Sequence, residues 1–330
     1  MKNKITKRQW RLRRAQSSRP DRIVGAVLLV LGLFFWISGV NPSFAKDKKE
    51  KIPKWLKTKT EIRYRFVEEF GEYRKILDNK QISLYDANGN LIEEAWYDAD
   101  GKLESKLLCQ YDNRGNQIEW TMYDAEDKLT SKGIYKYDAK NNQLERASYD
   151  TDGKLLGKCL YKYDGRGNQL EEAWYDAEGK LTSKHIYKYD DKGNQLDRAS
   201  YDTDGKLTAK VLLKYDDRGN MIEGTEYDTE GKLIEKCLFK CDAKDNQIEA
   251  ARYNTDGKLT DKHLLKYDDR GNMIEGAQSD ADGKLKTKFL SKYDDKGNRI
   301  ESANYEMKEK FGKVEEIPTD QTTWEYEFYK

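Results

Sequence analysis

Polar and apolar residues repeat along most of the chain with a period of 26 residues. Each period opens with the motif Tyr-Asp-x-x-Gly-Asn, and a related motif, Tyr-Asp-x-x-Gly-Lys-Leu, follows twelve residues later. Between the motifs apolar and polar residues alternate, which is the pattern of a β-strand with two unlike faces. The nine first motifs begin at Tyr85, Tyr111, Tyr137, Tyr163, Tyr189, Tyr215, Cys241, Tyr267 and Tyr293.

Each half of the period predicts a turn followed by a strand. Asp-x-x-Gly suits a type I turn whose fourth residue is left-handed and forms a G1 bulge. Where Gly is replaced within the array, the substitutes are Asn141, Asp127 and Asp245, the types that best tolerate positive φ after Gly. No Pro occurs between Pro53 and Pro318, as expected where almost every backbone N–H joins a ladder.

These turns predict an all-β fold. Turns at this spacing leave about 18 antiparallel strands of roughly eight residues in one long meander. Strongly twisted open sheets rarely exceed about ten strands without curling. We therefore expect a curled or spiralled, solenoid-like meander in which each unit packs on its neighbours and both ends are capped.

The alternation also predicts two faces. We number each unit from the first residue of its first motif, so that Tyr85 is at position 1. If every turn pairs its first residue with its fifth, odd and even positions stay on opposite faces throughout the meander. The odd face then carries Tyr at positions 1 and 13, Leu at 19 and an acid at 9, and the even face carries Lys at 18, 22 and usually 26.

The first 45 residues have the composition of an export signal. Residues 1–22 contain nine Lys or Arg and one acid, and an uncharged run of 18 residues, 23–40, follows. Ser43-Phe44-Ala45 supplies a small-x-small cleavage pattern. Because 18 apolar residues also reach the lower limit for a membrane span, a retained N-terminal anchor helix stays open as the alternative. In both cases the chain after this segment is expected outside the cytoplasm, whether periplasmic, at the cell surface or secreted.

The rest of the chain is one array rather than two domains. We expect a basic solvated linker, with membrane-surface contact as its alternative, then a degenerate N-terminal β cap, the repeats, and a degenerate C-terminal repeat or cap. In order, these segments are residues 46–60, 61–84, 85–304 and 305–330.

Export changes the charge balance. The whole chain has 61 bases and 60 acids, and charged residues make up 37% of it. Cleavage after Ala45 would remove nine bases and one acid and leave 52 bases and 59 acids, a net charge of −7. A mildly acidic chain with interspersed signs lacks the basic face that nucleic-acid binding requires.

The repeat resembles the YD, or RHS-type, repeats of bacterial surface and toxin-shell proteins. Tyr-Asp-x-x-Gly-Asn followed by a second Tyr-Asp half-repeat carries the resemblance, which covers about residues 85–304. It implies a β-meander that winds into a shell, and some members of the family are implicated in carbohydrate binding or toxin enclosure. Only 26 residues remain from Tyr305 onward, so neither a C-terminal toxin domain nor enclosure of a toxin is expected.

Three kinds of side chain are candidates for binding. The aromatic candidates at position 25 are Tyr135, Tyr161 and Tyr187, and Trp96 and Trp174 at position 12 are expected on the Lys-rich face. The acids at position 9, including Glu145 and Glu171, are expected on the face of the Tyr rows, where they would form an acidic ladder. The alternative is structural: each acid accepts a hydrogen bond from Tyr or pairs with Lys.

No metal or cofactor site is expected. Turns such as Asp150-Thr151-Asp152-Gly153 resemble calcium loops but lack the distant bidentate Glu. Four possible zinc ligands at position 23 stand two strands apart, roughly 10 Å, which is too far for one shared ion. They are Cys159, His185, Cys237 and His263.

Together these features predict an exported, non-enzymatic β-repeat protein of the bacterial envelope. It would present an extended Tyr-rich surface to a cell-envelope protein or polysaccharide, and touch a membrane only through residues 23–40 if these are retained. The alternative is a purely structural spacer or scaffold without a specific ligand. No catalytic set stands out from the repeats.

Overall fold

The computed structural model describes residues 56–310 and 312–330. The chain divides into two compact units, residues 1–47 and 48–330, and all described residues belong to the second. The expected signal or anchor therefore lies outside the described residues, as does most of the expected linker. Within the described part no helix is long and apolar enough to cross a membrane.

Twenty antiparallel strands form a single sheet. Four long strands flank the array: β1 (Leu56–Glu69), β2 (Glu72–Tyr85), β19 (Arg299–Lys310) and β20 (Lys313–Phe328). The repeats supply sixteen strands of 7–9 residues: β3 Leu91–Tyr97, β4 Leu103–Tyr111, β5 Gln117–Asp124, β6 Leu129–Tyr137, β7 Gln143–Tyr149, β8 Leu155–Tyr163, β9 Gln169–Asp176, β10 Leu181–Tyr189, β11 Gln195–Tyr201, β12 Leu207–Tyr215, β13 Met221–Tyr227, β14 Leu233–Cys241, β15 Gln247–Tyr253, β16 Leu259–Tyr267, β17 Met273–Asp280 and β18 Leu285–Tyr293.

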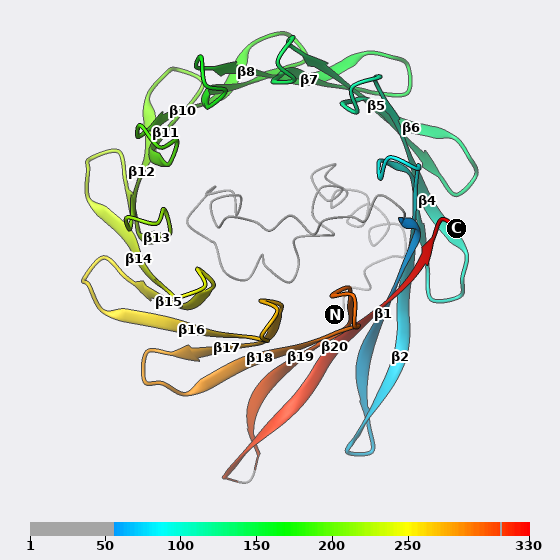
Figure 1. Ribbon diagram of the computed structural model, residues 1–330, viewed down its shortest axis with the longest axis vertical. Coiled ribbons are helices and arrows are strands. Elements are labelled where there is room, and N and C mark those ends of the chain that lie inside the picture. Colours follow the sequence, from blue (N-terminus) through cyan, green and yellow to red (C-terminus); the bar gives the residue numbers. More distant parts are fainter. Residues whose placement is uncertain (1–55, 311) are drawn as a thin grey trace, which may run out of the picture. The chain divides into compact units, whose positions relative to one another are not determined.

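The sheet closes into a barrel. β1 pairs with β20 from Leu56↔Phe328 to Arg65↔Asp320, so the first and last strands become neighbours (Figure 1). The all-β, antiparallel prediction is confirmed, but the prediction of an open, curled or spiralled solenoid of about 18 strands is wrong. Closure satisfies the N–H and C=O groups that two free edges would expose. The segments expected as caps, residues 61–84 and 305–330, contribute strands to this seam.

The turns have the predicted geometry. In the first of them the Asp86 N–H donates to the Asn90 C=O at 2.9 Å and the Gly89 N–H donates to the Asp86 C=O at 3.0 Å. Oδ1 of Asp86 also accepts the N–H groups of Asn88 and Asn90, and Oδ2 accepts the side-chain amide of Asn90 at 2.9 Å. The three residues that replace Gly have the expected positive φ: 60° at Asp127, 67° at Asn141 and 65° at Asp245.

The repeated Tyr at position 1 ties neighbouring hairpins together. The hydroxyl of Tyr137 donates to the Gln117 C=O of the preceding unit at 2.8 Å. Cationic side chains at position 4 do the same between turns, since Arg166 donates to the Asp191 C=O at 2.8 Å. The Tyr contact recurs at Tyr111, Tyr163, Tyr189, Tyr267 and Tyr293. The most regular residues of the motif are therefore structural.

Each turn is followed by a second irregularity that the sequence did not reveal. Tyr85 faces Leu91, but Leu84 faces Glu93, so that Ile92 is an extra residue. The other half-repeat has the same shift, with an extra residue at Glu104. A single extra residue moves the following side chains to the opposite face. The predicted division into an odd and an even face is therefore wrong.

Directly opposed residues of an antiparallel pair share a face, and the observed register defines two of them. Lys188 opposes Asp197, and Lys184 opposes Ala173, which places positions 9, 11, 22 and 26 together on what we call the outer face. Tyr161 opposes Glu172, which joins positions 25 and 10 on the inner face, together with 12, 21 and 23.

Crowding identifies the inner face as the concave one. Side chains converge on the concave side of a curved sheet and spread apart on the convex side. On the inner face, Cys159 and Val211 are fully buried and even Arg198 is only 4% exposed. On the outer face the Lys162 and Lys188 side chains are 71% and 73% exposed. The inner face therefore forms the packed lining of the barrel wall.

We expect Gly276→Ala to destabilise the barrel. Gly276 lies directly opposite Phe289, whose ring covers it, and a Cβ at this position would overlap the ring. Overpacking of this kind costs about 1–3 kcal/mol. Urea unfolding measures the loss, and Gly165→Ala is the control because a Cβ there meets nothing within 4 Å. Equal unfolding free energies for the two variants would contradict this account of the wall.

Candidate functional site

The inner face carries a row of aromatic and charged side chains from β6 to β11. Three of the predicted site residues, Tyr135 on β6, Tyr161 on β8 and Tyr187 on β10, occupy alternate strands. The residue opposite each Tyr is charged: Tyr135 faces Arg146, Tyr161 faces Glu172 and Tyr187 faces Arg198. Going around the wall, Tyr rings thus alternate with ionic groups. We call these six residues the tyrosine row.

Glu172 is the centre of the row. Its Oε1 accepts from Nε1 of Trp174 at 3.0 Å, and its Oε2 accepts from the hydroxyl of Tyr187 at 2.9 Å. Gln169 donates to Oε2 at 3.3 Å, and the Cys159 thiol lies 3.7 Å from Oε1. One carboxylate thereby fixes the orientation of two aromatic residues that come from different strands.

Burial raises the pKa of the phenols and of the thiol in and beside the row. Burial raises the pKa of Tyr161 and Tyr187, and the negative charge of Glu172 adds to the effect at Tyr187. Burial also raises the pKa of the Cys159 thiol to about 12. The phenols and the thiol therefore stay protonated at neutral pH and serve as hydrogen-bond donors rather than nucleophiles.

His185 lies beside the row, two residues before Tyr187 on β10. Its Nδ1 lies 2.9 Å from the Ser200 hydroxyl. Burial, followed by the positive charge of Arg198, lowers the pKa of His185. The imidazole is therefore neutral at neutral pH.

The structure corrects the predicted faces of the two Trp residues. Trp174 and Trp96 were expected on the Lys-rich face, but both lie at position 12 of the inner face. Trp174 opposes Cys159 and joins the row through Glu172. Trp96 lies on β3, opposite Gln81 and Ser105, three strands from Tyr135. The structure thus unites one of the two Trp with the tyrosines.

The predicted acidic ladder lies on the outer face together with the Tyr at position 13, since Tyr149 opposes Lys132 there. It is separated from the tyrosine row, which lies on the inner face. Glu145 pairs with Lys136 at 2.8 Å, and Glu171 pairs with Lys162 at 2.9 Å and Lys184 at 2.8 Å. Burial opposes ionisation of Glu171, but the hydrogen bonds from the two Lys outweigh it and lower the pKa. Glu145 and Glu171 therefore belong to a belt of ion pairs, which was the structural alternative for these acids.

No metal centre is found among the described residues. They contain no group of three or more His, Cys, Asp or Glu that could hold an ion. The Asp150 turn uses its carboxylate internally, since Oδ1 accepts the N–H groups of Asp152 and Lys154. His185 and His263 bond to Ser200 and Asp261 instead of sharing a ligand set.

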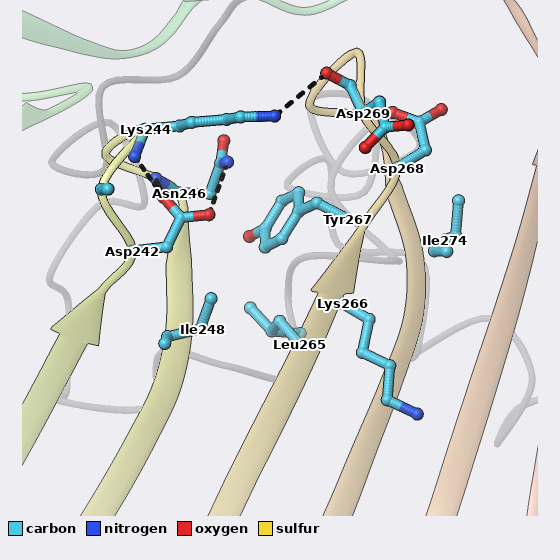
Figure 2. A pocket seen from close by; sticks show the side chains of 11 residues that line it. Asp242, Lys244, Asn246, Ile248, Leu265, Lys266, Tyr267, Asp268, Asp269 and Ile274 are labelled. Carbon is cyan, nitrogen blue, oxygen red and sulfur yellow. Dashed lines mark hydrogen bonds between the residues drawn. The ribbon is translucent and has the colours of Figure 1, made fainter.

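A cavity of about 510 Å³ opens between the first-motif turns of two successive units, at Asp242 and at Asp268 (Figure 2). Ile248, Leu265, Tyr267 and Ile274 contribute apolar surface. The polar side chains around it serve the turns: Lys244 donates to the Asp269 C=O at 3.3 Å, as the dashed line in Figure 2 shows. The cavity is therefore a gap between neighbouring turns, and the tyrosine row remains the stronger candidate.

Three residues of the row were missed from the sequence. Arg146, Glu172 and Arg198 all occupy position 10, where other units have Glu94, Trp120, Gly224, Ala250, Gly276 and Ser302. Their signal is a charged residue at this variable position in three consecutive units. This signal did not identify the site, because simple alternation placed position 10 on the face opposite the tyrosines.

No protein-family model matches the chain, and no curated protein matches it. Among solved structures, a porin-like protein from Bacteroides uniformis is 10% identical; the alignment covers 84% of this chain and 99% of that chain with a TM-score of 0.39. A porin-like protein from Bacteroides vulgatus is 11% identical over 82% and 98% of the two chains, with a TM-score of 0.24.

A Tc holotoxin pore structure from Photorhabdus luminescens is 15% identical; the alignment covers 76% of this chain but 16% of that chain, with a TM-score of 0.18. TM-scores below 0.5 do not establish a common fold. The resemblance to YD and RHS-type repeats therefore rests on the motif of this chain.

Proposed function

We propose that the protein is an exported, non-enzymatic β-repeat barrel of the bacterial envelope that binds an extended glycan through the tyrosine row. The observation that carries the proposal is the placement of Tyr135, Tyr161 and Tyr187 on alternate strands of one wall, each facing a charged side chain. A protein segment is the second ligand class that such a surface could take.

The chemistry of the row suits a sugar chain. Tyr offers an apolar ring with a polar tip, and the partly exposed Arg146 and Glu172 offer donors and acceptors. Alternate strands lie roughly 10 Å apart, which is close to the length of two linked sugar rings. A linear glycan lying across the strands would therefore meet a Tyr at every second ring.

The envelope assignment is supported by the N-terminal sequence and not by the barrel wall. Lys and Glu pairs occupy the middle of the outer face, for example Lys236, near the centre of β14, with Glu223 at 2.9 Å. A Lys facing lipid at the bilayer midplane costs about 2–4 kcal/mol, and membrane barrels instead carry an apolar outer band. We therefore place the barrel in water and reserve any membrane contact for residues 23–40.

A structural spacer without a ligand is the alternative function. It is supported by the repeated Tyr at position 1, whose hydroxyls are used between hairpins. The tyrosine row separates the two functions because binding depends on its rings and a spacer does not require them.

We expect Tyr161→Ala to weaken binding of a glycan-array hit about tenfold or more, which is about 1.4 kcal/mol. The loss follows from removal of the middle ring of the row. Isothermal titration calorimetry with the oligosaccharide measures it, beside thermal unfolding to confirm that the barrel persists. Tyr149→Ala on the outer face is the matched control and should bind as the wild type does.

Three outcomes oppose the proposal. If both variants bind like the wild type, the ligand lies elsewhere. If no glycan binds and a protein partner is captured through the same residues, the second ligand class is correct. Turnover in a hydrolase assay would refute the non-enzymatic assignment.

A further inference from the structure

One guanidinium of the tyrosine row lacks a counter-ion. Arg146 lies on the inner face of β7, opposite Tyr135 of β6 and Cys159 of β8. Its side chain is partly exposed. Within residues 56–310 and 312–330 it forms no ion pair and donates no hydrogen bond. A charge that is partly withdrawn from water and lacks a partner is costly, so the stability of the wall does not explain this residue.

Two other arginines of the inner face differ from Arg146. Arg252 on β15 has its Nε 3.6 Å from a carboxylate oxygen of Glu235 and 3.6 Å from one of Asp261. Arg198 on β11 is only 4% exposed, so hardly any of it could touch a ligand. Arg146 is accessible, and the part of the chain that the structure describes supplies no acid to it.

Two acids of neighbouring positions are engaged elsewhere. Glu145 precedes Arg146 in the chain but lies on the outer face, where a Lys pairs with it at 2.8 Å. Glu172 shares the inner face but lies on β9, two strands or roughly 10 Å away. Its two oxygens already accept from Trp174 and Tyr187. Neither carboxylate therefore neutralises the guanidinium.

The neighbours of Arg146 suit an anion. Tyr135 and Tyr161 come from the two strands that flank β7. Burial raises the pKa of both phenols, although the positive charge of Arg146 opposes the rise. Both hydroxyls therefore stay protonated at neutral pH and can donate hydrogen bonds. A carboxylate bound beside Arg146 would meet a guanidinium with phenol donors on either side.

We propose that Arg146 binds a carboxylate of the ligand, so that the glycan held by the tyrosine row is acidic and places a uronic acid at this residue. The inference rests on the proposed glycan function and adds the chemical class of the ligand. A guanidinium presents two parallel N–H donors that match the two oxygens of a carboxylate. The rings of Tyr135 and Tyr161 contact the sugar that carries the charge.

Paired oligosaccharides test the proposal with the full chain. The probes contain glucuronic acid, and each is compared with its carboxyl-reduced form, in which a primary alcohol replaces the carboxylate. Isothermal titration calorimetry should show that the wild type binds the acidic form at least tenfold more tightly than the reduced form. Added salt should diminish this preference, because it screens the charge pair.

Arg146→Gln should abolish the preference, so that the variant binds the acidic and the reduced form equally. Lys158→Gln is the matched control. It also removes one positive charge, but Lys158 lies on the outer face, opposite Ala147. This variant should keep the wild-type preference. Loss of the preference in both variants would mean that net charge, and not Arg146, selects the acidic form.

Thermal unfolding distinguishes a binding role from a structural one. Arg146→Gln loses no ion pair, so its melting temperature should equal or exceed that of the wild type. A fall of about 4 °C or more would show that Arg146 supports the wall and would contradict the inference.

The failure of this inference differs from the failure of the proposed function. If the wild type binds both forms equally and Tyr161→Ala weakens both, the tyrosine row binds a glycan but Arg146 selects no carboxylate. If neither form of any oligosaccharide binds, the proposed function and the inference are both wrong.

Discussion

Deletion of residues 313–330 is expected to abolish the stable barrel rather than shorten it by one strand. β20 pairs on one side with β19 and on the other with β1. It also supplies Nε1 of Trp324 to Glu61 at 2.9 Å and the Glu327 carboxylate to Lys57 at 2.9 Å. Each lost hydrogen bond removes about 0.5–1.5 kcal/mol, so two ladders approach the whole stability of a domain, about 5–15 kcal/mol.

Urea unfolding and limited proteolysis measure this loss, with deletion of Lys330 alone as the control. The truncated chain should become protease-sensitive and associate through the exposed edges of β1 and β19. A peptide of residues 313–330 added in trans should restore protection, because it can fill the vacant place between the two edges. Near-native protection of the truncated chain would show that closure contributes nothing and would favour an open meander.

The local structure of the array follows from its residues. Asp-x-x-Gly fixes a turn at every motif, and the substitutes Asn141 and Asp245 reveal the left-handed position even where Gly is missing. Turn spacing then sets the strand length. These predictions succeed because each depends on a few residues close together in the chain.

Closure could not be predicted in the same way. It depends on the pairing of Leu56 with Phe328 and its continuation along two strands that lack the repeat motif. Whether a curled sheet spirals or closes is decided by the accumulated twist of twenty strands, and no single unit encodes that sum. The long terminal strands were visible in the sequence only as alternating residues in expected caps.

Only part of the candidate site could be predicted, because the face of each side chain depends on a bulge that the sequence does not reveal. The three tyrosines share one face, as their common position 25 implies, but their companions were assigned through an alternation that the extra residue at position 8 reverses. Whether they bind a ligand stays a prediction. The acids Glu145 and Glu171 were predicted beside the tyrosines but pair with Lys on the outer face. Glu172 was predicted on the other face but lies beside the tyrosines. Nothing in Asn-Leu-Ile or Asn-Gln-Ile marks a second bulge, because its geometry comes from pairing across the strand.

With the faces assigned from the observed register, the nearly invariant positions of the repeat can be separated from the variable ones. Positions 1, 2 and 6 hardly vary and their side chains hold turns and hairpins together. Position 10 differs widely between units, and from β7 to β11 its residues are Arg146, Glu172 and Arg198. An array built from copies can only specialise where a copy departs from its neighbours. The tyrosine row is such a departure on the concave wall.

Acid is expected to unfold the barrel cooperatively. The pKa is lowered at all nine Asp of the first motif: Asp86, Asp112, Asp138, Asp164, Asp190, Asp216, Asp242, Asp268 and Asp294. A lowered folded-state pKa adds stability above the unfolded value, about 3.9. That stability is lost as the pH falls through the folded-state pKa. Melting temperature should therefore change little on this account from pH 8 to 5 and fall steeply below about 4.

The cause can be tested at one turn. The side-chain amide of Asn168, followed by its backbone N–H, lowers the pKa of Asp164. Asp164→Asn would place two amide donors against each other, at 2.8 Å in the present geometry, and should lower the melting temperature at pH 7 by about 2–4 °C while reducing the acid dependence. Asp150→Asn is the matched control, because Lys154 replaces the amide there and Asn254 already fills the equivalent place, with its Oδ1 accepting two backbone N–H groups. Equal melting temperatures of the two variants would mean that the Asn amide does not stabilise the ionised turn.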